Sequence, residues 1–341
     1  MCDSGFKGDG VRILVTGSAG FIGSHLSRRL LAAGHEVIGL DALTPYYDVR
    51  LKAQRHAMLE ASSRFRAVIG RLEDAAAIDA AFSEAPEVVV HLAAQAGVRY
   101  SLEAPFSYTD SNVTGTLAIL EAARRTPLKH LLIASSSSVY GMAGKPSAEL
   151  DMTDRPVSLY AATKKATEAM SHSYAHLFEV PVTCLRFFTV YGPWGRPDMA
   201  LFRFAEAIAA GEPISIYGEG RMRRDFTYVD DVVTAIDRLI GVAPVQGQPV
   251  SAVDSLSPVA PWRVVNIAGG RPVELMRFVS AIERAMGREA KKELLPMQPG
   301  DVTETAADVG LLRALVDEVP QTEVEDGVRA FCEWFRGWRG V

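Results

Sequence analysis

Residues 11–23 read VRILVTGSAGFIG, a short apolar run that leads into three glycines with the spacing GxxGxxG. The helical pattern of residues 21–35 follows, so the stretch predicts a buried strand, a tight turn and a helix. Glycines let the backbone approach a phosphate closely, and the amino end of a helix supplies free N–H groups and a partial positive charge. The stretch therefore predicts a site for the diphosphate of a dinucleotide, although simple strand–helix turns share this spacing.

An aspartate closes the next apolar run, EVIGLD at residues 36–41. The carboxylate of Asp41 can accept hydrogen bonds from both hydroxyls of an adenosine ribose, and it would repel a 2′-phosphate. NAD is therefore favoured over NADP as the cofactor. The alternative interpretation is a solvated aspartate at the end of a strand.

Strand and helix patterns alternate through the first half of the chain. Continuous apolar runs separated by helical stretches indicate a parallel sheet covered on both faces. The expected fold class is α/β, a Rossmann-type doubly wound parallel sheet with a smaller mixed α/β substrate domain toward the C-terminus. The further strand candidates are residues 65–70, 88–94, 130–136 and 182–190. We expect an NAD-binding domain at 11–189 (with 228–243 and about 263–268 returning to it), a substrate domain at 190–227 and 269–335, an exposed loop at 243–261, and a flexible extension at 1–10.

The composition is that of an ordinary globular protein. The chain has 341 residues, of which 48% are hydrophobic and 23% charged, and a net charge of −5. Neither nucleic acid nor an anionic membrane is favoured as a partner by this charge. No apolar run approaches the ~20 residues of a membrane helix, and the first ten residues do not read as a signal peptide. Three widely spaced cysteines form no metal pattern and suggest a reducing compartment, so we expect a cytoplasmic protein without a bound metal.

The stretch SLYAATKKA at residues 158–166 adds a candidate for proton transfer. Tyr160 and Lys164 are four residues apart, so both lie on one face of the predicted helix. A phenol normally titrates near ~10. A neighbouring ammonium group and a positively charged nicotinamide would lower that pKa and let Tyr160 accept a proton from a substrate hydroxyl. Alone, such a pair is most often an ordinary helix surface; together with a dinucleotide turn it favours an oxidoreductase site.

GxxGFIG, YxxxK and a serine at the end of a strand resemble the motifs of the extended short-chain dehydrogenase/reductases, which act on nucleotide sugars. Longer stretches are similar to the branch of that family that epimerises UDP-glucuronate at C4. The resemblance extends from about residue 11 to the C-terminus. Its stretches are DALTPYYDVRLK (41–52), HLAAQAGVRYSLE (91–103), SSSSVYG (135–141), SLYAATKKA (158–166), LRFFTVYGPWGRPDMALFRF (185–204), RRDFTYVDD (223–231) and LLPMQPGDV (294–302).

The resemblance implies the roles of individual residues. Ser136, four residues before the Tyr of VYG, would be the catalytic serine beside Tyr160 and Lys164. Ser137 and Ser138 stand where related dehydratases and decarboxylases carry Asp or Glu. A serine hydroxyl cannot act as such an acid or base, but it can donate a hydrogen bond to a carboxylate. The implied cofactor contacts are Gly17, Gly20, Phe21, Ile22, Gly23, Asp41, Leu72, Leu92, Ala93, Ala94, Tyr160 and Lys164, and the implied substrate contacts are Ser137, Ser138, Thr189, Arg196, Met199, Ala200, Leu201, Arg224 and Asp301.

The implied activity is the interconversion of UDP-glucuronate and UDP-galacturonate through a 4-keto intermediate. A neutral UDP-sugar 4-epimerase, a UDP-glucuronate decarboxylase and a non-catalytic NAD-binding protein are the alternatives; turn capping is the alternative role for Ser137 and Ser138. Family members commonly pair through two helices each, which implies a homodimer through the helices at 104–126 and 159–178. Two departures from the family pattern concern the NAD contacts. Ala42 stands where relatives usually have Asn. Arg71, which has no hydrogen-bond acceptor, stands where they usually have an Asp near the adenine.

Overall fold

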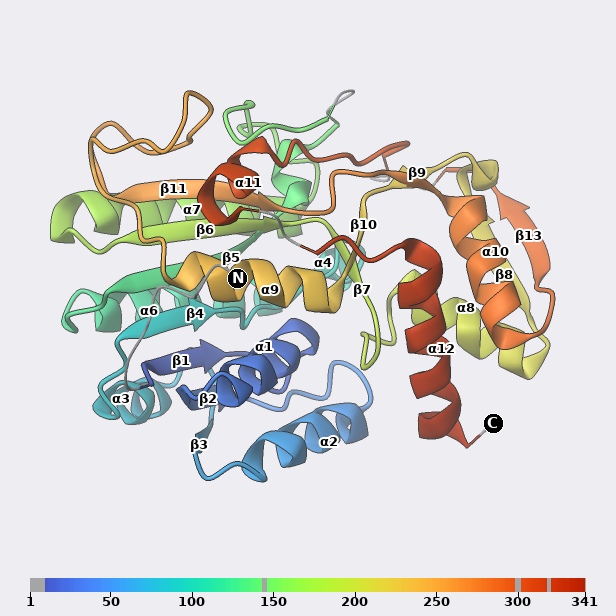
Figure 1. Cartoon of the computed structure of the whole chain (residues 1–341), viewed down its shortest axis with the longest axis horizontal. Helices are drawn as coiled ribbons and strands as arrows, with labels where there is room; N and C mark the ends of the chain where they lie inside the picture. Colours follow the sequence, from blue (N-terminus) through green and yellow to red (C-terminus); the bar gives the residue numbers. More distant parts are fainter. Residues whose placement is uncertain (1–9, 143–145, 298–301, 318–319, 341) are drawn as a thin grey trace.

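A seven-stranded parallel sheet forms the centre of the computed structural model, which describes residues 10–142, 146–297, 302–317 and 320–340 (Figure 1). The strand order is β11-β6-β5-β4-β1-β2-β3. Strands β4 and β5 are buried along their whole length, as expected for a parallel sheet that is covered on both faces. The strands of this sheet are β1 (Arg12–Thr16), β2 (Glu36–Asp41), β3 (Phe65–Ile69), β4 (Val88–His91), β5 (His130–Ser136), β6 (Val182–Phe187) and β11 (Trp262–Ile267).

Helices cover both faces of the sheet and bury two separate apolar layers against it. One layer packs under α1, α9 and α11, and Figure 1 shows α1 and α9 in front of the sheet. The other lies under α3, α6 and α7. This arrangement confirms the predicted doubly wound α/β class. The helices are α1 (Phe21–Ala32), α2 (Val49–Glu60), α3 (Ala75–Ser83), α4 (Tyr100–Glu103), α5 (Pro105–Tyr108), the π-helix η1 (Thr109–Thr114), α6 (Gly115–Ala123), the 3-10 turn η2 (Ser137–Tyr140), α7 (Leu159–Phe178), α9 (Val229–Ile240) and α11 (Gly310–Val316).

The strand order reverses between β1 and β4. From β1 the chain moves outward through β2 to β3, and it then returns to place β4, β5 and β6 on the other side of β1. Connections that leave β1 and β4 in opposite directions open a crevice at the carboxyl edge of the sheet. The glycine-rich turn, Asp41 and Ser136 all follow or end strands at that edge, so the topology brings them together.

A second, smaller unit packs around its own aromatic core. Figure 1 shows α8, α10 and α12 gathered at one end of the molecule, and Phe202, Phe278, Phe331 and Phe335 are buried between them. The single strand expected at 182–190 is wrong in detail. Strand β6 ends at Phe187, and β7 then leaves the main sheet to pair with β10. The elements of this unit and its links are β7 (Thr189–Tyr191), α8 (Ala200–Ala210), β8 (Pro213–Tyr217), η3 (Gly218–Gly220), β9 (Arg223–Arg224), β10 (Phe226–Tyr228), β12 (Val273–Glu274), α10 (Leu275–Met286), β13 (Lys291–Leu295) and α12 (Val324–Arg339).

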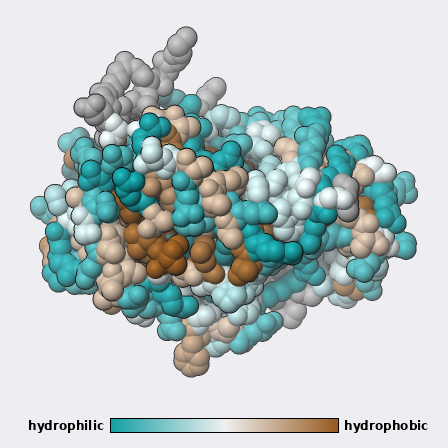
Figure 2. All heavy atoms as spheres, turned by 90° about the horizontal axis from the view of Figure 1, so that it is seen from below, coloured by the Kyte–Doolittle hydropathy of each residue, from teal (hydrophilic) through white to brown (hydrophobic). Residues whose placement is uncertain are grey.

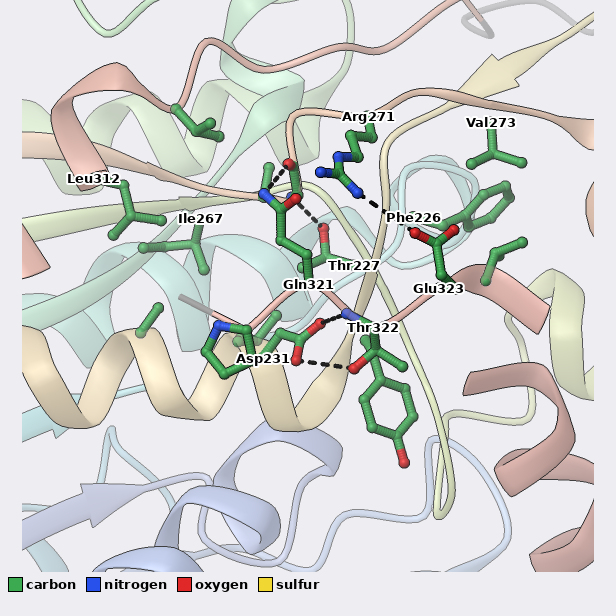
Figure 3. A pocket seen from close by; sticks show the side chains of 18 of the residues that line it. Phe226, Thr227, Asp231, Ile267, Arg271, Val273, Leu312, Gln321, Thr322 and Glu323 are labelled. Atoms are coloured by element: carbon green, nitrogen blue, oxygen red, sulfur yellow. Dashed lines mark hydrogen bonds and ion pairs between the residues drawn. The ribbon is translucent and has the colours of Figure 1, made fainter. Parts of the chain in front are cut away.

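A short polar seam joins the two units just before α12, around a cavity of about 60 Å³ (Figure 3). The carboxylate of Asp231, in the first turn of α9, accepts hydrogen bonds from the Thr322 N–H at 2.7 Å and from the Thr322 hydroxyl at 3.0 Å. The Gln321 amide donates to the Gly269 carbonyl at 3.0 Å. These bonds satisfy the polar groups of the seam and fix where α12 begins.

The sheet edge at β3 and the loop at 243–261 are the irregular parts of the surface. Strand β3 has a neighbour on one side only, Ile69 at its end is 55% exposed, and Figure 2 shows hydrophobic residues gathered near the middle of this face. Residues 243–261 form neither helix nor strand, and Asp254 anchors them through an ion pair with Arg263 at 3.2 Å. None of the helices in the described ranges has the length and apolar character that crossing a membrane requires.

Candidate active site

The glycine-rich turn between β1 and α1 leaves no room for a Cβ at its three glycines, Gly17, Gly20 and Gly23. Gly17 has a φ of +73°, and a Cβ on it would lie 2.9 Å from the Ala93 nitrogen. A Cβ on Gly23 would lie 2.0 Å from the Gly17 carbonyl oxygen. The close approach brings the amino end of α1, with its helix-terminal N–H groups, to the wall of the cleft. The turn therefore fits the diphosphate of a dinucleotide.

Asp41 lies beside this turn at the end of β2. Its carboxylate accepts hydrogen bonds from the Ala19 N–H at 3.0 Å and from the Leu43 N–H at 2.8 Å. Each oxygen keeps a lone pair for a further donor, such as a ribose hydroxyl. At the same end of the cleft Arg71 pairs with Glu73 at 3.3 Å, so its charge is already partly balanced there.

One cleft of about 1020 Å³ runs from the glycine-rich turn across the sheet edge to the second unit. It contains all but two of the residues that the sequence predicted for the site. Leu201 does not line it, because this side chain lies on the inner face of α8 and packs into the aromatic core. Asp301 lies outside the described residues. The predicted residues that line the cleft are Gly17, Gly20, Phe21, Ile22, Gly23, Asp41, Leu72, Leu92, Ala93, Ala94, Ser136, Ser137, Ser138, Tyr160, Lys164, Thr189, Arg196, Met199, Ala200 and Arg224.

Tyr160 and Lys164 lie in the first turns of α7 and face the end of β5. The hydroxyl of Ser158 caps this helix by accepting a hydrogen bond from the Ala161 N–H, which fixes where the helix begins. The Lys164 ammonium donates to the Ala134 carbonyl at 2.8 Å, and burial lowers the pKa of Lys164 to about 8. Burial raises the pKa of Tyr160, while a hydrogen bond with Ser136 acts in the opposite direction.

The four consecutive serines have different surroundings. Ser135 is buried, and its hydroxyl donates to the Glu168 carboxylate at 2.6 Å. The Ser136 hydroxyl accepts a hydrogen bond from the Ser138 N–H at 3.1 Å and so caps the 3-10 turn η2. Within the described part of the chain the hydroxyls of Ser137 and Ser138 have no protein partner, and both residues line the cleft. Turn capping thus falls to Ser136, which leaves the next two hydroxyls available to a ligand.

The far end of the cleft carries the predicted arginines. Arg196 forms a two-pronged ion pair with Asp198, with Nε to Oδ1 at 3.0 Å and Nη2 to Oδ2 at 2.6 Å. Burial lowers the pKa of Arg196, but the charge and hydrogen bonds of Asp198 outweigh it and raise the pKa. Arg224 lies on β9, where Nη2 donates to the Val302 carbonyl at 2.7 Å. Thr189 begins β7 and lines the same cleft.

A buried polar network behind the site was missed in the sequence. Glu168, one turn after Lys164 on α7, forms a two-pronged ion pair with Arg186 on β6, and the same carboxylate accepts the Ser135 hydrogen bond. Arg186 also donates to the Tyr140 hydroxyl at 3.0 Å. One network therefore joins the three motifs around SSSSVYG, YxxxK and LRFF. An arginine in the middle of an apolar strand was the available signal, because a buried charge needs a partner.

Two further residues near the cleft were not predicted as part of the site. Asn112, in the π-helix η1, bonds both backbone groups of Gln95 and the Thr163 hydroxyl, so it fixes the loop after β4 against α7. His91 is buried between two threonine hydroxyls, and burial lowers its pKa to about 3. The imidazole of His91 is therefore a neutral packing group.

Comparison with known proteins identifies relatives over nearly the whole chain. Residues 13–249 match the family described as NAD dependent epimerase/dehydratase. A probable UDP-glucuronate 4-epimerase of Rhizobium meliloti (strain 1021) is 57% identical over 330 residues, which cover 95% of this chain and 97% of that protein.

Solved structures give the same result. UDP-glucuronic acid 4-epimerase from Bacillus cereus, in complex with UDP-glucuronic acid and NAD, has a TM-score of 0.85 and 32% identity and covers 96% of this chain and 100% of that one. UDP-glucose 4-epimerase from Thermus thermophilus, in complex with NAD, has a TM-score of 0.81 and 29% identity and covers 96% and 99%. As the resemblance of its motifs predicted, the chain belongs to the NAD dependent epimerase/dehydratase family.

Proposed function

We propose that this protein is an NAD-dependent 4-epimerase that interconverts UDP-glucuronate and UDP-galacturonate. One observation supports this above all: the hydroxyls of Ser137 and Ser138, free of protein partners among the described residues, lie in the same cleft as Tyr160 and Arg196. Such donors suit a sugar carboxylate next to the reacting carbon. Relatives named for this activity match 95–96% of the chain, which adds to the case.

The residues that would hold NAD are those whose geometry fits it. The glycine-rich turn and the amino end of α1 would receive the diphosphate, and Asp41 the adenosine ribose. Tyr160 and Lys164 would lie at the nicotinamide end. Bound there, NAD would supply the redox chemistry at C4 of the sugar, as acceptor of its hydride and then as the donor that restores it on the opposite face.

Proton transfer at the C4 hydroxyl is the task of the chain itself. Tyr160 would take the proton as the C4 carbonyl forms, with the Ser136 hydroxyl hydrogen-bonded to the same oxygen. Tyr160 must be a phenolate before it takes this proton, and Lys164 would stabilise that phenolate, since its pKa of about 8 leaves it largely charged at pH 7. When the carbonyl is reduced on its other face, Tyr160 would return the proton.

The 4-keto intermediate of this substrate is a β-keto acid, which loses CO2 when its carboxylate stands perpendicular to the carbonyl. Ser137, Ser138 and Thr189 would hold the carboxylate near the ring plane by hydrogen bonds. Because these donors are neutral and have no accessible pKa, they add neither a negative charge nor an acid–base group. Arg196 would bind the same carboxylate from the second unit, and Arg224 would bind the UDP diphosphate.

The decisive test is NMR of the purified protein with UDP-glucuronate and no added cofactor, following the anomeric signals and bicarbonate. We expect UDP-galacturonate to form until it reaches a stable ratio with UDP-glucuronate, with little CO2 released. The cofactor for this reaction would be NAD that co-purifies with the protein. A UDP-pentose would instead mean decarboxylation and would contradict the roles given to Ser137 and Ser138. Conversion of UDP-glucose alone would mean a neutral-sugar epimerase, and no conversion of either sugar after NAD is added would favour a binding protein.

We further propose a homodimer, because an apolar surface covers the helices that the sequence singled out. Phe106 on α5 is 79% exposed, Leu117, Leu177 and Phe178 on α6 and α7 are exposed as well, and Leu102 on α4, just before the first of these helices, is 80% exposed. Light scattering of Phe106→Asp would show a shift to monomer. Val253→Asp, in the exposed loop, is the control and should leave the mass unchanged; a monomeric parent protein would refute the dimer.

The remaining assignments follow from the resemblance. We place the NAD-binding unit at 11–189 with returns at 228–243 and about 263–268, and the UDP-sugar unit at 190–227 and 269–335. The pairing of β11 with β6 and the packing of α9 beside α1 support this division. We also place the enzyme in the cytoplasm, upstream of polysaccharide synthesis; the free thiols of Cys184 and Cys332 agree with a reducing compartment.

A further inference from the structure

Arg55 is a fully buried cation for which the proposed mechanism has no use. It lies on α2, its exposed fraction is 0%, and among the described residues it has no carboxylate partner. Its Nε is buried without an acceptor in the part of the chain that the structure describes. Burying a charge with only neutral partners is unfavourable by several kcal/mol, so an apolar side chain would serve stability better at this place. A guanidinium here needs a reason other than packing.

The two ends of this guanidinium reach two different parts of the cleft wall. Nη1 donates to the Ala19 carbonyl at 3.2 Å, inside the glycine-rich turn, and to the Tyr47 hydroxyl at 2.7 Å. Nη2 donates to the carbonyls of Trp194 at 2.5 Å and Gly195 at 3.3 Å. One planar group thus fixes the turn that fits the dinucleotide and the peptide that leads directly into Arg196.

The segment before Arg196 needs such a support. Trp194 has a φ of +59°, in the left-handed region that side chains other than glycine rarely adopt. A backbone in that region persists only when its surroundings hold it. The two hydrogen bonds of Nη2 provide that hold. Gln54, the residue before Arg55 on α2, makes a second contact with the other unit, because its side-chain oxygen accepts a hydrogen bond from the Trp338 indole at 3.2 Å.

We propose that Arg55 is a positioning residue that ties the glycine-rich turn to the Trp194–Gly195 peptide and thereby sets Arg196 for the acidic group of the substrate. The proposal rests on the function proposed above. It predicts that Arg55 matters for the sugar acid and not for the UDP moiety, because its hydrogen bonds reach the peptide before Arg196 and not strand β9, which carries Arg224. Lysine cannot replace it, since one ammonium group cannot span both segments as the fork does.

The experiment compares Arg55→Lys with Arg50→Lys, the same change at a 72% exposed position on the same helix. Calorimetry gives the dissociation constants of UDP-glucuronate and of UDP, and release of NAD on denaturation gives the NAD content per chain. For Arg55→Lys we expect the UDP-glucuronate constant to rise about tenfold, the size of one charge-assisted hydrogen bond, while the UDP constant changes less than about twofold. NAD content should fall, because the Ala19 contact is lost. Arg50→Lys should change none of the three.

An equal change in both dissociation constants, or no change in either, would overturn the proposal. Should Arg55→Lys fail to fold, Tyr47→Phe removes one of the four acceptors and keeps the cation. It should raise the ratio of the UDP-glucuronate dissociation constant to the UDP dissociation constant by a smaller factor. An unchanged ratio would contradict the proposal. Failure of the proposed function would look different. It would appear in the unaltered protein as an absence of UDP-galacturonate, whatever the ratio in the variants.

Discussion

The ion pair between Glu168 and Arg186 offers a sharp test of what holds the carboxyl end of β5, with its four serines, in place. Glu168 is 2% exposed, and its two oxygens accept hydrogen bonds from Nε and Nη2 of Arg186 at 2.8 and 2.9 Å. The same carboxylate accepts a hydrogen bond from the Ser135 hydroxyl at 2.6 Å, one residue before Ser136, the proposed catalytic serine. Glu168→Gln keeps the size of the side chain but removes its charge.

The expected loss follows from the burial of both partners. Removing one member of a buried ion pair destabilises a protein by about 3–5 kcal/mol, because the other charge is left uncompensated. Burial lowers the pKa of Arg186, and Glu168→Gln removes the carboxylate that raises it, but a guanidinium is so basic that Arg186 stays charged in the variant. We therefore expect the free energy of unfolding to fall by about 3–5 kcal/mol, and kcat to fall because the strand bearing Ser136 loses its anchor.

Urea unfolding followed by tryptophan fluorescence measures this effect. The variants are Glu168→Gln, Arg186→Met and the double change Glu168→Gln with Arg186→Met, which should be less destabilised than the sum of its parts. Glu36→Gln, in the exposed pair with Arg12, is the matched control and should cost less than about 1 kcal/mol. A loss below about 1 kcal/mol for Glu168→Gln, or full additivity in the double variant, would refute the reasoning.

Four other substitutions test the site. Tyr160→Phe removes the proton acceptor and should lower kcat by about 10²–10⁴-fold, with UDP-glucuronate still bound in calorimetry. Lys164→Met should abolish turnover yet raise the free energy of unfolding at pH 7. The pKa of Lys164 is about 8 in the folded protein and ordinarily 10.5, so between these pH values the unfolded chain binds more protons than the folded one. The free energy of unfolding of the parent protein therefore rises with pH in this window, and Lys164→Met should remove that rise. Gly23→Ala drives a Cβ into the Gly17 carbonyl and should empty the purified protein of NAD, as measured after denaturation. Ser138→Asp places a second negative charge beside the sugar acid and should raise KM for UDP-glucuronate at least about tenfold while UDP affinity is kept.

Features that repeat along the chain could be predicted from the sequence. The apolar runs predicted the parallel strands, and the spacing of three glycines placed the turn at the end of β1. The four-residue interval between Tyr160 and Lys164 placed both at the cleft, since a helix has that period. Each of these signals is local, so one chain segment contains all of it.

Contacts between distant segments could not be predicted in the same way. Arg186 meets Glu168 across 18 residues, and Arg55 meets Trp194 across 139. No periodicity connects such pairs, because their distance is set by which helix covers which strand. The break in the strand after Phe187 also depends on a distant segment. The local pattern predicts one continuous strand, but β7 leaves the main sheet because it pairs with β10.

The run of four serines shows how one residue type comes to have three tasks. The Ser135 hydroxyl bonds Glu168 on α7, and Ser136, the next residue on the strand, faces the opposite side. Where the strand gives way to the 3-10 turn, the alternation ends, and Ser137 and Ser138 both line the cleft. A carboxylate at either of the last two positions would repel an acidic sugar, and an apolar residue would leave its oxygens without donors. A small neutral hydroxyl meets both demands, which is the physical reason we propose for the run to extend past Ser136.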